Sequence, residues 1–304
     1  MTLQQLHYAL MIAREGSMNK AAEKLYISQP NLTNAIKQLE EETGITIFER
    51  SNKGVTITEE GNEFLFNARQ IYSQYEMLEE KYGKKKDAKK RFAVSCQHYS
   101  FATKAFVQMV RHYDTLYYEF AIRETKTLDV IRDVAEARSE VGILYLSNYN
   151  RKYIEKLLKN GNLEFSPLVS VNAMVYLYKD HPLAKESSIT LKQLQDYPCL
   201  IFEQGSESLG YLAEEILTEN IYDRVIHTTD RATNLNLMRS INAYTLCSGI
   251  ISEELNGGDY IAVPYEADED NPNASMEIGY ITRKNAILSK IAKTYIQELK
   301  NYLA

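Results

Sequence analysis

Three features that mark particular classes of protein are scarce in this 304-residue chain. No apolar run approaches the roughly eighteen residues of a membrane-spanning helix, so we expect no membrane association. The first residues lack a basic stretch followed by an apolar core, so we expect no secretion signal. Cys96, Cys199 and Cys247 are odd in number, far apart and without a Cys-x-x-Cys pair, which fits reduced thiols in a cytoplasm.

Catalytic motifs and an excess of positive charge are also missing. The five histidines are dispersed without a metal-binding pattern, and there is no Gly-x-Ser-x-Gly turn, Walker loop or dinucleotide fingerprint. We therefore expect no enzyme, no metal and no cofactor. The formal net charge is −6, and residues 1–60 hold six Lys or Arg against eight Glu. Any contact with nucleic acid must depend on where the cations lie rather than on their sum.

What the chain does contain is a pair of short helices over residues 17–39. Ser17 follows Gly16, where one helix should stop and the next be capped. Ser28 can cap the second helix, whose first turn tolerates Pro30 because its backbone donors have no partner there. The apolar positions at helical spacing in this second helix are Leu32, Ile36 and Leu39. The pattern predicts a helix-turn-helix with polar groups facing outward, although a solvated helix face would look similar.

A wider set of residues resembles the DNA-binding domain of LysR-type transcriptional regulators. The order and spacing match over about sixty residues, at Ala21, Ala22, Leu25, Ser28, Gln29, Pro30, Ile36, Leu39, Glu40, Gly44, 48–50 and 58–61. The resemblance implies a sequence-specific regulator that binds double-stranded promoter or operator DNA and responds to a small-molecule effector. We expect DNA contacts from Ser28, Gln29, Pro30, Asn31, Thr33, Asn34, Lys37, Arg50 and Lys53. Asn34 stands where many members carry Arg, so no base preference is carried over.

A hairpin and a long helix should follow. The β-prone runs 45–48 and 55–57 predict a wing with Arg50 and Lys53 at its tip. A heptad stripe comes next, at Phe64, Ala68, Ile71, Tyr75, Leu78 and Tyr82. The stripe could pack on its own domain, but we favour pairing with a second subunit because the small winged helix already has its core. In the resembling family this linker helix dimerises, which implies a homodimer or homotetramer.

The rest of the chain alternates strands and helices, which predicts an α/β fold with mixed sheets. The expected strands are 92–96, 117–123, 140–146, 171–178, 199–202, 223–228, 245–251, 260–263 and 277–282. The phrase over 175–184 resembles the family's effector domain, which implies a two-lobed fold like that of periplasmic binding proteins. We expect a DNA-binding domain over 1–58, a linker helix and hinge over 59–90, and a regulatory domain over 91–304. Its first lobe would span 92–165 and 268–304, and its second 166–267.

Polar groups at strand ends mark the candidate effector cleft. Open α/β sheets bind ligands where strands end and helices begin. The candidates for effector contact are His98, Ser100, Thr125, Thr127, Gln204 and Thr229. Ser100 and Thr127 could instead be helix N-caps, and Arg231 could hold an anionic effector or pair with Asp230. These groups suit a small polar metabolite.

Two other classes of protein compete with a regulator. A two-lobed solute-binding protein without a role in transcription would share the C-terminal fold. It would need a signal peptide, however, and would need neither the Ser28 to Pro30 turn nor the heptad helix. An enzyme on a two-lobed scaffold would need a catalytic set, which the motifs do not supply.

Overall fold

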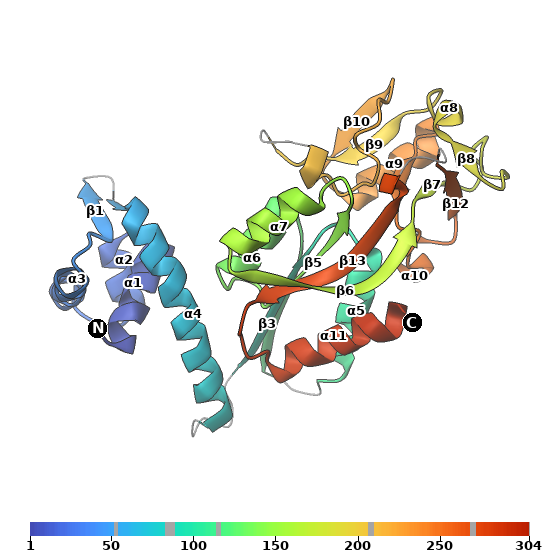
Figure 1. Cartoon of the computed structure of the whole chain (residues 1–304). Coiled ribbons are helices and arrows are strands. Elements are labelled where there is room, and N and C mark those ends of the chain that lie inside the picture. Colours follow the sequence, from blue (N-terminus) through green and yellow to red (C-terminus); the bar gives the residue numbers. More distant parts are fainter. Residues whose placement is uncertain (52–53, 83–88, 114–116, 206–209, 268–271, 304) are drawn as a thin grey trace. The chain divides into compact units, whose positions relative to one another are not determined.

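The computed structural model describes residues 1–304 except 52–53, 83–88, 114–116, 206–209, 268–271 and 304 (Figure 1). The chain divides into two compact units, Met1–Ala88 and Lys89–Ala304. Within the described ranges, no helix has the length and apolar character needed to span a bilayer.

The N-terminal unit is a winged helix-turn-helix followed by a long helix. Its elements are α1 (Leu3–Glu15), α2 (Met18–Lys24), α3 (Gln29–Thr43), β1 (Phe48–Ser51), β2 (Gly54–Ile57) and α4 (Glu59–Tyr82). Thr2 and Gln5 form a reciprocal capping box at the start of α1, and Gly16 ends it in the left-handed region at φ 61°. Ser17 and Ser28 cap α2 and α3, as the sequence predicts.

Small and aliphatic side chains fill the core of this unit. Those with no exposed surface are Ala9, Ile12, Ala21, Leu32, Ile36, Leu39 and Ile47. A fully buried alanine on α2 lets α3 approach closely, and the inward face of α3 is the one that its helical spacing predicts. The apolar face of α3 therefore packs on the core of this unit, and its polar face points away from that core.

The wing begins later than the sequence indicates. The apolar pattern predicts that the first strand begins at residue 45, but it begins at Phe48. The reason is that the Glu40 side chain binds the backbone just before the strand. Its Oε1 accepts hydrogen bonds from the Ile47 and Phe48 backbone amides at 2.7 and 3.0 Å. The two strands pair antiparallel from Phe48 opposite Ile57 to Ser51 opposite Gly54. Residues 52 and 53 at the tip lie outside the described residues.

A glycine lets the start of α4 approach the wing. A Cβ built on Gly61 would lie 2.3 Å from the Ile47 carbonyl oxygen and 2.8 Å from Thr58 Oγ1. Thr58 Oγ1 accepts from the Gly61 backbone amide at 2.8 Å and so caps α4. The contact fixes the long helix to the helix-turn-helix core.

We expect Gly61→Ala to lower the free energy of unfolding by about 1–3 kcal/mol, because the added methyl group meets backbone that cannot move aside. Urea denaturation followed by circular dichroism measures the change. Gly258→Ala is the control, since a Cβ there meets nothing within 4 Å. Equal stability of the two variants would contradict the close approach.

The heptad stripe of α4 divides into two parts. Phe64 and Ala68 pack on the unit's own core, and Tyr72 stacks on His7 of α1 with ring centroids 4.8 Å apart. Further along, Ile71 is 47% exposed and Leu78 is 58% exposed. The Tyr82 side chain lies outside the described residues. Packing on its own domain thus accounts for the start of the stripe but not for its exposed aliphatic positions.

The C-terminal unit is built on two sheets (Figure 1). The first lobe has the strand order β4-β3-β5-β13-β6, and helices pack around its sheet. Its strands are β3 (Lys90–Cys96), β4 (Tyr118–Glu124), β5 (Val141–Ser147), β6 (Leu163–Asn172) and β13 (Ser275–Arg283). Its helices are α5 (Ser100–Arg111), α6 (Thr127–Ala135), α7 (Arg151–Asn160) and α11 (Lys290–Leu303). The parallel pairs β3–β4 and β3–β5 bring the carboxyl ends of these three strands to the same edge of the sheet.

The second lobe has a four-stranded sheet of order β11-β7-β12-β8 and a separate parallel pair, β10-β9. Its strands are β7 (Met174–Tyr178), β8 (Ile189–Thr190), β9 (Cys199–Phe202), β10 (Val225–Thr228), β11 (Thr245–Cys247) and β12 (Tyr260–Glu266). Its helices are α8 (Leu191–Leu194), α9 (Arg231–Ile241), α10 (Glu253–Asn256) and the short 3-10 turns η1 (Gly210–Leu212) and η2 (Pro272–Ala274), the last on the return to β13.

One strand expected for this unit is wrong. The single strand expected over 171–178 is two strands that break at Ala173, and β6 extends back to Leu163 because its whole length pairs with β13. The lobe boundary expected at residue 166 thus lies within β6. After β9 the described residues form the 3-10 turn η1 and further turns.

Candidate functional site

The outer face of α3 carries the polar side chains that the sequence singles out. Pro30, Asn31, Asn34 and Lys37 are exposed, and Gln29 and Thr33 are half-buried. Gln29 Nε2 donates to Thr33 Oγ1 at 2.9 Å, which fixes the amide along the helix surface. The Ser28 hydroxyl accepts from the Asn31 backbone amide at 3.4 Å. The structure therefore gathers these expected DNA contacts on one helix.

Positive charge on this face is modest. The Lys37 ammonium lies 3.6 Å from Glu41 one turn on, and both side chains are well exposed. An exposed pair of this kind is worth little and separates readily when a phosphate competes for the lysine. Arg50 lies in β1 but its side chain, like the whole of Lys53, is outside the described residues.

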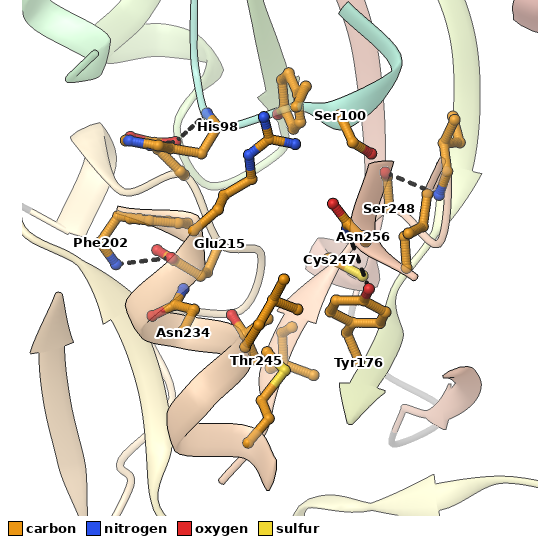
Figure 2. A pocket seen from close by; sticks show the side chains of 18 of the residues that line it. His98, Ser100, Tyr176, Phe202, Glu215, Asn234, Thr245, Cys247, Ser248 and Asn256 are labelled. Atoms are coloured by element: carbon orange, nitrogen blue, oxygen red, sulfur yellow. Dashed lines mark hydrogen bonds and ion pairs between the residues drawn. The ribbon is translucent and has the colours of Figure 1, made fainter. Parts of the chain in front are cut away.

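The C-terminal unit holds a cavity of about 90 Å³ between its two lobes. The first lobe contributes His98, Ser100 and Met276, and the second contributes Tyr176, Arg231 and Cys247 among others. Figure 2 shows Glu215 and Asn234 on one side of the open space and Ser248 and Asn256 on the other. The segment that follows β3 therefore lines a cavity together with residues of the second lobe.

Of the six expected effector contacts, two line this cavity and four do not. His98 and Ser100 belong to its wall, whereas Thr125, Thr127, Gln204 and Thr229 do not. Thr127 and Gln204 instead meet each other across the lobes, since the Thr127 backbone amide donates to Gln204 Oε1 at 3.0 Å. The Thr125 amide donates to the Cys96 carbonyl, and Thr229 is exposed after β10.

Neither Ser100 nor Thr127 is a helix N-cap, so that alternative is wrong. Tyr99 and Lys126 occupy the cap positions, and both lack a capping side-chain bond. Ser100 Oγ accepts from the Ser252 backbone amide of the second lobe at 2.9 Å. Thr127 Oγ1 accepts from Gln97 Nε2 at 2.6 Å. Both hydroxyls are buried and serve tertiary contacts.

His98 is held by a carboxylate of the opposite lobe. Its Nδ1 lies 2.9 Å from Glu214 Oε2, the same oxygen accepts from the His98 backbone amide at 2.7 Å, and the ring stacks on Phe202. Burial lowers the pKa of His98, but the hydrogen bond and charge of Glu214 outweigh burial and leave the pKa raised. The raised pKa favours the charged imidazolium, and the contact of His98 with Glu214 joins the two lobes.

Arg231 also bridges the lobes rather than pairing with Asp230. Its guanidinium binds Glu124 in two places, including Nε to Oε2 at 3.1 Å. Asp230 instead caps α9 by accepting from the Thr233 amide at 2.9 Å. The alternative in which Arg231 pairs with Asp230 is therefore wrong, because Asp230 caps α9 and Arg231 binds Glu124.

The sequence reasoning missed the acidic residues of the site, Glu124, Glu214 and Glu215. Glu215 Oε1 accepts from the Phe202 backbone amide at 2.8 Å. Burial, and next the charge of Glu214, raise the pKa of Glu215 to about 8. A signal was present, since Glu214 and Glu215 interrupt an otherwise apolar run over 212–217. Carboxylates are rarely fully buried unless they have a partner.

Comparisons with known proteins cover both units. Residues 3–62 match the family described as bacterial regulatory helix-turn-helix protein, lysR family, and residues 92–304 match the LysR substrate binding domain. YbhD of Escherichia coli, an uncharacterized HTH-type transcriptional regulator, is 26% identical over 96% of this chain and 89% of its own length. AlsR of Bacillus subtilis, another HTH-type transcriptional regulator, is 26% identical over 83% of this chain and 78% of its own length.

Solved structures share the fold. A variant of full-length OxyR from Pseudomonas aeruginosa is similar with a TM-score of 0.68 and 20% identity, over 100% of this chain and 94% of that one. CbnR in complex with its target DNA has a TM-score of 0.55 and 16% identity, over 99% of this chain and 100% of that one.

Proposed function

The chain belongs to the LysR family of transcriptional regulators, and from that premise we propose that α3 reads its operator while the cavity between the lobes binds the effector. The observation that carries the proposal is the outward polar face of α3, backed by three fully buried aliphatic residues. Amide and hydroxyl groups held in this way suit base edges in the major groove. A helix of this kind presents its N-terminal residues to the groove.

The second part of the proposal is that the effector shifts the balance between two lobe arrangements. The bonds from Ser100, His98 and Arg231 to the opposite lobe hold the described arrangement together. A ligand can change this balance only through its different affinities for the two arrangements. We propose that the shift alters the spacing of DNA-binding domains in an oligomer.

DNase footprinting of the region upstream of the protein's own gene tests the proposal. We expect protected half-sites whose centres are separated by whole helical turns, because a symmetric dimer places its two recognition helices on one side of the duplex. A uniform pattern without protected sites anywhere in that region would contradict it.

We further propose that α4 forms a dimer seam and that such dimers pair into tetramers. Ile71 and Leu78 lie seven residues apart, so they share one helix face, and both are exposed. Apolar positions repeated at heptad spacing on an exposed face fit a partner helix. In this scheme residues 1–58, 59–90 and 91–304 are the DNA-binding, linker and regulatory domains.

We expect Ile71→Lys to weaken the dimer at least about tenfold, since the variant places a charge in an apolar seam. Size-exclusion chromatography with light scattering, at several protein concentrations, measures the effect. Asn62→Lys, at an exposed position on the opposite side of the same helix, is the control. A wild-type protein that is monomeric at micromolar concentration would refute the seam.

We propose that the protein works in the cytoplasm as a regulator and not as an enzyme. Its DNA-binding unit and its likeness to transcriptional regulators support this over a solute-binding role, for which the helix-turn-helix would have no use.

A further inference from the structure

We propose that the effector is a small α-amino acid with an apolar side chain, bound through its ammonium by Glu215 and through its carboxylate by Arg231. This inference rests on the proposed function, because it concerns the same cavity. Two buried polar atoms, on residues that line the cavity, carry it. Glu215 Oε2 and Arg231 Nη1 both lack a hydrogen-bond partner among the described residues.

The acceptor is a buried carboxyl group whose Oε2 has no hydrogen-bond partner among the described residues. Glu215 is 4% exposed, and its Oε1 binds the Phe202 backbone amide. Leaving the other oxygen buried and unpaired is costly, more so for a charged group than for a neutral one. A ligand ammonium supplies both the missing donor and the opposite charge.

The donor is an arginine with one nitrogen left over. Nε and Nη2 of Arg231 donate to Glu124, and Nη1 has no partner among the described residues. A ligand can therefore bind Nη1 while the bridge between the lobes stays intact. Two hydroxyl groups in the cavity wall can supply further hydrogen-bond donors. Ser100 Oγ and Ser248 Oγ each accept a backbone amide, from Ser252 at 2.9 Å and Ile250 at 3.2 Å, which leaves each hydroxyl hydrogen to donate. A ligand carboxylate satisfies these donors.

The charges around the cavity and its volume narrow the range of possible ligands further. Two carboxylates, Glu124 and Glu214, face two cationic groups, Arg231 and the charged form of His98. Glu215, whose pKa is raised to about 8, ionises when a ligand ammonium lies beside it, so a zwitterion is accommodated and a dianion is disfavoured. The remaining wall is apolar and includes Leu235, Met238, Ile250 and Met276. The cavity is small, at about 90 Å³, which favours the side chain of valine or leucine over an aromatic one.

Calorimetry on the full-length protein tests this with a matched series of compounds. L-Valine is compared with isovalerate, which lacks the ammonium, with isobutylamine, which lacks the carboxylate, and with L-phenylalanine. We expect L-valine to bind at least about tenfold more tightly than each of the other three. Isovalerate or isobutylamine binding as tightly as L-valine overturns the inference. So does the absence of heat from all of L-alanine, L-valine, L-leucine and L-methionine at millimolar concentrations.

Variants locate the binding. Glu215→Gln should reduce L-valine affinity at least about tenfold, to the level of isovalerate, and Arg231→Lys should do so while still pairing with Glu124. Glu203→Gln, an exposed carboxylate outside the cavity wall, is the control and should bind as the wild type does. Unchanged affinity in Glu215→Gln overturns the assignment.

The DNA-binding activity of the same preparation separates the two proposals. A protein that binds operator DNA but none of the amino acids overturns only the ligand class. A protein that binds L-valine in the expected manner but has no specific site on DNA supports the ligand class and counts against the proposed function.

Discussion

Glu214→Ala should lower the free energy of unfolding by about 3–5 kcal/mol, the usual cost of removing one partner from a buried charged pair. The side chains of His98 and Glu214 are only 10% and 4% exposed. The substitution leaves the His98 ring and backbone amide without their acceptor and also removes the acceptor of Gln204 Nε2. Urea denaturation followed by tyrosine fluorescence is suitable, since the chain has no tryptophan. A loss below about 1 kcal/mol would show that the pair does not hold the lobes together.

The same pair makes stability depend on pH in a defined direction. The pKa of His98 is raised above its value of 6.5 in the unfolded chain. Its contribution is therefore fully present below pH 6.5 and is lost as the pH rises through the folded-state pKa. The difference in stability between wild type and His98→Gln should thus be largest below pH 6.5 and shrink above it. A difference that grows with pH would contradict the charged pair.

The double variant Gln29→Ala and Asn34→Ala should lose most of its specific DNA binding while remaining folded. Each amide that contacts a base is worth roughly 1–3 kcal/mol of discrimination, so the pair together should cost one to several orders of magnitude in affinity. Fluorescence anisotropy with operator DNA measures the loss. Asn67→Ala removes an exposed amide from α4 instead of α3 and should bind normally. Unchanged sequence preference in the double variant would remove α3 from the recognition role.

The DNA-binding unit was predictable from the sequence because its signals are local. Caps at Ser17 and Ser28 and the spacing of Leu32, Ile36 and Leu39 act within one or two helical turns, and the structure confirms them. The start of the wing was not predictable, because it depends on Glu40 reaching backbone amides seven and eight residues away.

The cavity was only partly predictable because its contacts join distant segments. His98 meets Glu214 across 116 residues, and Arg231 meets Glu124 across 107. Strand ends could be located from the sequence, but nothing local says that an acidic partner arrives from the other lobe. A neighbour such as Asp230 is then the natural choice for Arg231, although it is the wrong one.

The central claim, that this protein recognises a particular DNA sequence through α3, is tested most directly by competition. Labelled DNA from upstream of its own gene is bound to the full-length protein and displaced either by the same sequence or by a shuffled sequence of equal composition. We predict that the shuffled competitor needs a concentration at least about a thousandfold higher, as is usual for specific regulators. Equal displacement by the two competitors would contradict sequence-specific recognition.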